Sequence, residues 1–171
     1  GYLGAAIAGF LLTAVPNWTG RLPIVGRPLA ALAALWLAGR VAVLSSAGLP
    51  PLLVAGLDVG FPVVLGALLV REVVAGRNWR NLMVLAMLAV FAAGNALFHW
   101  EAARGDYAAQ GVGLRLGLAA ALMMIGLIGG RIVPSFTRNW LARRGAGRLP
   151  VAPMQRFDRW ALLLLLAVLL M

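Results

Sequence analysis

The sequence predicts an all-α protein, a polytopic bundle of transmembrane helices, and three observations support this fold class. Of the 171 residues, 63% are hydrophobic and only 12% are charged, whereas a soluble domain carries about 25% charged residues. Apolar runs of close to ~20 residues recur, which is the length needed to cross a ~30 Å hydrocarbon core. The charged residues fall mainly in short segments between these runs. We therefore expect four complete spans and a partial span at each end.

The six apolar segments follow one another in chain order. Residues 1–15 and 160–171 are too short for a full span, so we expect both to be partial. The complete spans are predicted at residues 28–47, 51–70, 82–98 and 112–134. Because the sequence opens and closes inside apolar segments, we expect residues 1–171 to form a single membrane domain within a larger protein.

Arginines in the connections predict the orientation of the spans. Residues 16–27, 71–81 and 135–159 are rich in arginine, whereas the connection near Leu49 has no charge and the one before residue 112 has mixed charge. Connections that stay in the cytoplasm carry an excess of basic residues. The three arginine-rich connections are therefore expected to be cytoplasmic, and the other two external.

The composition also excludes several classes of function. Cysteine is absent, which excludes disulfides, zinc-thiolate sites and cysteine nucleophiles in this sequence. The net charge of +10 is spread over loops without interleaved aromatics, so we expect the lipid bilayer and not nucleic acid as the partner. No Ser-His-Asp set, carboxylate pair, phosphate loop or dinucleotide glycine motif occurs. Whether the protein is an enzyme stays open, and protein partners are unknown.

Two charged residues fall inside predicted spans. Arg40 lies nine residues before Leu49 and Asp58 nine residues after it, so an antiparallel hairpin would place both roughly 13 Å from its turn. We predict an Arg40–Asp58 ion pair, since an unpaired charge in the membrane is costly. The pair could be purely structural, or it could face a substrate or relay protons.

His99 is the one histidine of the sequence and a candidate metal ligand. Asn95 lies four residues earlier and shares its helix face. Arg115 enters the next span from the same side, so we expect the three to line one outward-facing site. A neutral imidazole is a common ligand for haem iron or copper, and an interfacial, hydrogen-bonded histidine is the alternative.

Proline and glycine suggest where helices end and touch. Pro16 and Pro134 each precede an arginine-bearing connection, and we expect each to end its helix. Small residues at helical spacing predict close helix contacts. These are the pairs Gly56/Gly60, Gly113/Gly117 and Gly126/Gly130.

Three segments resemble the NnrS family. They are Ala5–Arg21 around Pro16-Asn17-Trp18-Thr19, the pairs Gly94-Asn95 and Phe98-His99, and Ile128–Leu141 around Pro134-Ser135-Phe136-Thr137. The resemblance implies a bacterial inner-membrane protein of about twelve helices that holds haem and copper. It also implies a role in nitric oxide metabolism, denitrification or tolerance of nitrosative stress.

The resemblance adds His99 as the ligand candidate for this part of the family pattern. The family's histidine-rich segment, of the form Trp-His-x-His-Glu, is expected before the first block. Asn95, Arg115 and Arg131 are weaker candidates that would orient a ligand or haem propionates.

Three functions remain open from the sequence. The first is a haem/copper protein that binds, senses or consumes nitric oxide. The second is a transporter or channel for a small solute or metal complex, with Arg40, Asp58 and Pro62 marking the path. The third is an assembly partner of a respiratory complex.

Overall fold

The structure, a computed structural model, describes residues 2–145 and 156–170, without the side chains of Arg80, Arg131 and Leu170. Within these residues it contains six α-helices and no strand, which confirms the predicted fold class. The helices are α1 (Tyr2–Thr19), α2 (Arg27–Leu44), α3 (Pro51–Ala75), α4 (Leu82–Ala103), α5 (Val112–Arg143) and α6 (Arg156–Leu170). Short 3₁₀ turns, η1 (Ser46–Gly48), η2 (Trp79–Asn81) and η3 (Ala108–Gln110), lie in three of the connections.

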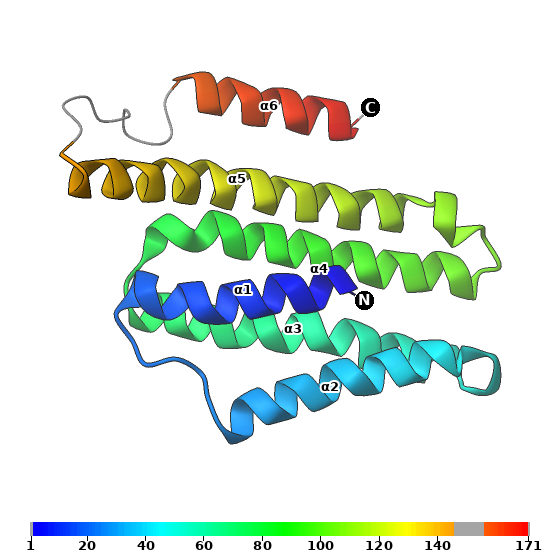
Figure 1. Ribbon diagram of the computed structural model, residues 1–171. Helices are drawn as coiled ribbons and strands as arrows, with labels where there is room; N and C mark the ends of the chain where they lie inside the picture. The colour runs from blue at the N-terminus through cyan, green and yellow to red at the C-terminus, as the bar shows by residue number, and fades with distance from the viewer. Residues whose placement is uncertain (1, 146–155, 171) are drawn as a thin grey trace. The chain divides into compact units, whose positions relative to one another are not determined.

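The chain divides into two compact units, and the boundary between them along the sequence falls within α5, after Ala121. The first unit holds α1 to α4 and the start of α5. In it α2, α3 and α4 run antiparallel, each to the next, and α3 contacts α1, α2 and α4 (Figure 1). Leu65, Leu69 and Val73 of α3 are among the most deeply buried side chains. The core of this unit is therefore built around α3.

Among the residues that the structure describes, four helices are long and apolar enough to cross a membrane: α2, α3, α4 and α5. At 1.5 Å per residue, the 25 residues of α3 extend about 37 Å, which exceeds the ~30 Å hydrocarbon core. Large apolar side chains such as Leu44, Leu52 and Val64 are exposed on these helices, and lipid is the solvent that accommodates them. The protein is a multi-pass membrane protein.

The prediction that proline ends two of the helices is wrong. α1 continues through Pro16 to Thr19, and α5 continues through Pro134 to Arg143. Each proline removes a single backbone N–H, and membrane helices tolerate that loss. The hydroxyls of Thr19 and Thr137 also bond back to the carbonyls of Val15 and Val133, both at 2.9 Å. The first connection is consequently shorter than expected, at 20–26. The connection at 76–81 is also shorter than expected, because α3 extends to Ala75.

Candidate functional site

A partly open cavity of 240 Å³ lies in the first unit, and helices α1 to α5 all contribute to its wall. Most of the wall is apolar, including Trp36, Phe61, Phe91 and Leu118. The polar contribution comes from four side chains. These are Arg40 on α2, Asp58 on α3, and Asn95 and His99 on α4.

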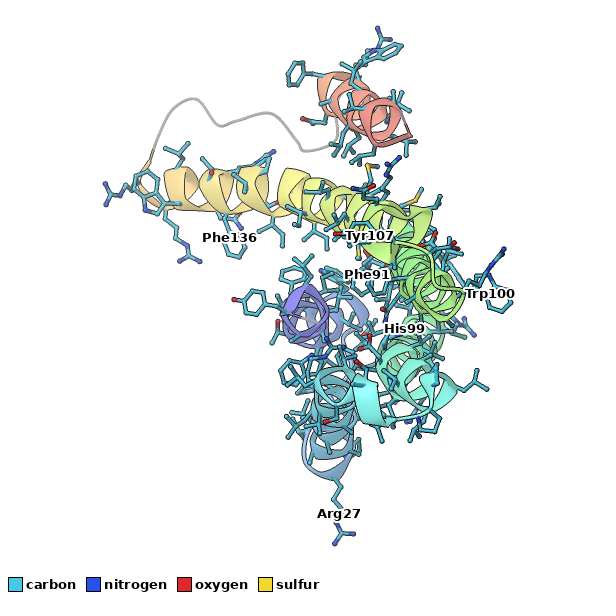
Figure 2. The ribbon with its side chains drawn as sticks, turned by 90° about the vertical axis from the view of Figure 1, so that its right-hand side faces the viewer. Arg27, Phe91, His99, Trp100, Tyr107 and Phe136 are labelled. Carbon is cyan, nitrogen blue, oxygen red and sulfur yellow. The ribbon has the colours of Figure 1, made fainter. Side chains whose placement is uncertain are left out.

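The Asp58 carboxylate holds two of these groups. One oxygen, Oδ1, forms an ion pair with Nη2 of Arg40, and the other, Oδ2, lies 2.9 Å from Nε2 of His99. Only 11% of the Asp58 side chain and 13% of the His99 side chain are exposed. Figure 2 shows His99 among the helices of the unit, whereas the neighbouring Trp100 points outward. A single buried carboxylate thus connects α2, α3 and α4.

Gly39 allows α2 to approach α3 at this point. A Cβ at Gly39 would lie 3.2 Å from the Asp58 Cα and from the Leu57 carbonyl oxygen, so a larger residue would push the two backbones apart. The predicted contact through Gly56 and Gly60 is not observed. Nothing lies within 4 Å of a Cβ at Gly56, and only the Leu35 side chain, at 3.9 Å, approaches one at Gly60. The face of α3 that approaches α2 most closely is therefore the one that carries Asp58.

Glycines also bring α4 and α5 together near His99. A Cβ at Gly94 would lie 2.6 Å from the Gly117 nitrogen, and one at Gly113 would lie 2.7 Å from the Phe98 Cα. Glu101 also stabilises the contact between α4 and α5. Its carboxylate accepts hydrogen bonds from the first two N–H groups of α5, that of Val112 at 2.9 Å and that of Gly113 at 3.2 Å. An acidic group at a helix N-terminus is favourable for hydrogen bonding and for the helix dipole. These contacts hold the end of α4 that carries His99.

The structure brings together Asn95 and His99 but not Arg115. Asn95 and His99 line the cavity, whereas Arg115 is exposed and does not contribute to the wall. Gly113 faces α4, and a residue two positions later on a helix points about 200° around the axis. Arg115 therefore points away from the site. The Arg131 side chain lies outside the described residues.

The contact between Asp58 and His99 was not predicted from the sequence, although counting along the chain could have found it. Asp58 lies 18 residues before Gly76 (76 − 58), and His99 lies 18 residues after Asn81 (99 − 81). In the antiparallel pair α3 and α4 the two residues are thus at matched depth. Counting from the other connection gave only the partner on α2.

The orientation of His99 determines which metal chemistry it can support. With Nε2–H donating to Asp58, a neutral imidazole keeps the Nδ1 lone pair available to a metal, and a carboxylate behind the ring is the usual support of a histidine ligand. Among the residues that the structure describes, no three His, Cys, Asp or Glu side chains gather closely enough to hold a metal ion. His99 would therefore supply one imidazole nitrogen ligand to a metal or haem group. By itself it does not fit a complete copper site.

Comparison with known proteins places the chain in a family. Residues 1–171 match the family model described as NnrS protein. No curated protein matches the chain, and no solved structure does so either. The family match extends over the whole sequence and includes the helices that line the cavity. The chain belongs to the NnrS protein family.

Proposed function

We propose that this protein is an integral membrane haem/copper protein of the NnrS type, involved in nitric oxide metabolism or in the response to nitrosative stress. Family membership and the four candidate spans support the proposal. The observation that carries it is the His99 imidazole, held by Asp58 in the wall of the cavity. We further propose the bacterial inner membrane as its location, with the arginine-rich connections in the cytoplasm.

Each polar residue of the cavity has a distinct part in this proposal. His99 would offer Nδ1 as a ligand of the haem iron, Asp58 would fix the orientation of the ring, and Arg40 would balance the charge of the carboxylate. When bound, haem would supply an iron that can take nitric oxide as a ligand. Copper needs further ligands besides His99. The apolar wall would limit access of water to the site and leave room for a small neutral ligand.

The size of the cavity bears on what it can enclose. Its 240 Å³ is less than the roughly 300–1,000 Å³ of sites that bury a drug-sized ligand. A diatomic gas fits inside it with room to spare, whereas a whole porphyrin does not. The described residues would therefore form one side of a haem site.

The test is an optical absorption spectrum of the detergent-purified protein, with and without reductant. Replacing His99 by alanine should abolish or shift the haem bands. Arg115→Gln is the matched control, because Arg115 is a polar candidate that points away from the cavity, and its spectrum should equal that of the wild type. Identical spectra for wild type and His99→Ala would remove His99 from the ligand set. A protein without haem, despite an adequate haem supply, would contradict the proposal.

A transporter or channel for a small solute is the second candidate, and one observation favours it. Arg40, Asp58 and Pro62 all line the same cavity, and intramembrane charges beside a proline are features of solute pathways. Flux of a solute through liposomes that contain the haem-free protein would favour this function. An absence of flux together with a haem spectrum would favour the first.

A further inference from the structure

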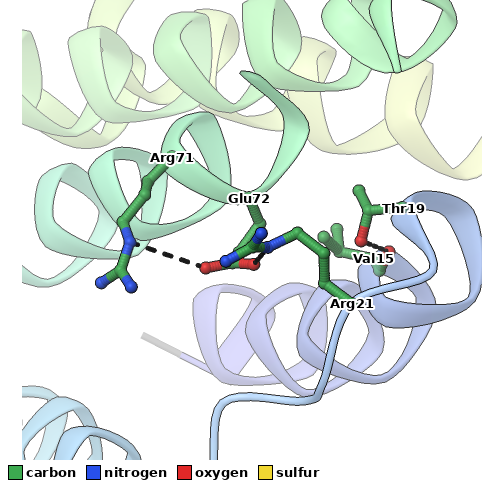
Figure 3. Close-up of polar contacts among 5 residues, drawn as sticks. All are labelled: Val15, Thr19, Arg21, Arg71 and Glu72. Atoms are coloured by element: carbon green, nitrogen blue, oxygen red, sulfur yellow. Dashed lines mark hydrogen bonds and ion pairs between the residues drawn. The ribbon is translucent and has the colours of Figure 1, made fainter. Parts of the chain in front are cut away.

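The first unit has a second charged cluster, at the end that carries residues 20–26 and 76–81. Glu72, near the end of α3, is buried and lies between two arginines (Figure 3). Its Oε2 accepts a hydrogen bond from Nε of Arg21 at 2.5 Å, and its Oε1 lies 3.8 Å from Nε of Arg71. Two guanidinium groups share one carboxylate, so the cluster keeps one uncompensated positive charge.

The cluster is held by close packing between the ends of α1 and α3. The Asn78 side chain donates a hydrogen bond to the Trp18 carbonyl. A Cβ at Gly76 would lie 2.7 Å from the Thr19 Cβ, so the glycine is what allows α1 to approach here. Arg21 follows this contact directly, and its position beside Glu72 is therefore fixed by the fold.

A groove with a volume of 590 Å³ runs along this cluster, between residues 20–28 and α3. Arg21, Arg71 and Glu72 form its polar part, and Leu22, Ile24 and Leu68 are among its apolar residues. A second groove of 730 Å³ shares Arg21 and Ile24 and continues along Leu12 and Leu29. The Leu22 side chain is 89% exposed, so an apolar surface lies next to the charged Arg21. The surface thus combines a cationic end with a long apolar wall.

The excess positive charge of the cluster and the apolar wall of the groove together indicate which class of ligand would fit. A guanidinium group binds phosphate in a planar, bidentate manner, and one excess positive charge matches one phosphodiester. Free phosphate would satisfy the arginines but would leave the apolar wall uncovered. An anionic phospholipid supplies both parts, and basic pockets between membrane helices bind such headgroups.

We propose that this groove binds an anionic phospholipid, with its phosphate on the guanidinium groups of Arg21 and Arg71, whose side chains are 41% and 72% exposed, and an acyl chain along the apolar wall. The groove shares no residue with the cavity around His99. The two proposals therefore stand or fall independently.

Native mass spectrometry of the detergent-purified protein tests the proposal, with phosphatidylglycerol and zwitterionic phosphatidylcholine as probes. Arg71→Gln is the test variant, because this side chain is 72% exposed and its loss should not impair folding. Arg138→Gln, an exposed arginine of α5, is the control for general positive charge. Arg71→Gln should weaken retention of phosphatidylglycerol about fivefold, as expected for one arginine beside an anionic headgroup, whereas Arg138→Gln should not.

Several outcomes would contradict the proposed phospholipid site. Equal loss in both variants would mean that only the overall charge attracts lipid. Equal retention of both lipids would show that the phosphatidylglycerol charge is not recognised. Displacement of the lipid by millimolar inorganic phosphate would assign the site to a soluble anion. Thermal unfolding of Arg71→Gln checks its fold, and its haem spectrum should equal that of the wild type.

Discussion

At the scale of single residues, Asp58 is the side chain on which the cavity depends most. Its two oxygens bind Arg40 and His99, so both polar neighbours lose their partner if the carboxylate is removed. Within the described residues, Nε of Arg40 is buried without a hydrogen-bond partner. Arg40 therefore relies on Asp58 to compensate its charge inside the membrane, where an unpaired charge is costly.

Replacing Asp58 by asparagine should destabilise the protein, because it leaves the Arg40 guanidinium without a counter-charge. Removal of one partner of a buried ion pair costs about 3 kcal/mol or more, and thermal unfolding in detergent would measure the effect. The Arg40→Gln single variant should be destabilised as well. The Asp58→Asn/Arg40→Gln double variant should recover part of the loss, since it leaves no unpaired charge. An unchanged melting temperature in Asp58→Asn would show that the pair does not stabilise the fold.

At the scale of elements, three glycines determine where helices touch. Gly39 brings α2 against α3 beside Asp58, and Gly94 and Gly113 bring α4 against α5 beside Phe98. In each case the neighbouring atoms are backbone, which cannot move aside as a flexible side chain can. Helix association in membranes depends on such small residues, since water does not drive apolar surfaces together there. The glycine contacts thus fix the two helices that present Asp58 and His99.

Gly113→Ala should separate α4 from α5 and destabilise the protein. The added Cβ would lie 2.8 Å from the Gly94 carbonyl oxygen, and overpacking of this kind costs about 1–3 kcal/mol. Gly117→Ala is the matched control, four residues further along the same helix, with nothing within 4 Å of its Cβ. It should leave the melting temperature unchanged or raise it, because alanine favours helix by up to ~1 kcal/mol. Equal melting temperatures for the two variants would contradict the close crossing.

At the scale of the whole molecule, the fold class follows from the sequence more directly than the site does. Apolar length and loop charge are properties of single segments, so the membrane helices could be predicted from them one at a time. The Asp58–His99 contact and the approach at Gly39 depend on how helices rotate about their axes, which the apolar pattern does not specify when nearly every face is apolar. Arg115 shows this limit. Its position along the helix was compatible with the site, but its side chain points away from the cavity.

The direction in which these helices cross the membrane can be tested with single cysteines, because the sequence contains none. Leu22 and Ser46 are exposed and lie beyond opposite ends of α2, whose 18 residues extend about 27 Å. Arginines cluster at the Leu22 end, so this end should face the cytoplasm. In cells whose membrane is intact, an impermeant maleimide should label Ser46→Cys but not Leu22→Cys. Permeabilisation should expose both, with the unsubstituted protein as the background control. Labelling of Leu22→Cys alone in intact cells would reverse the orientation and place the arginine-rich end, together with the lipid groove, on the outer side.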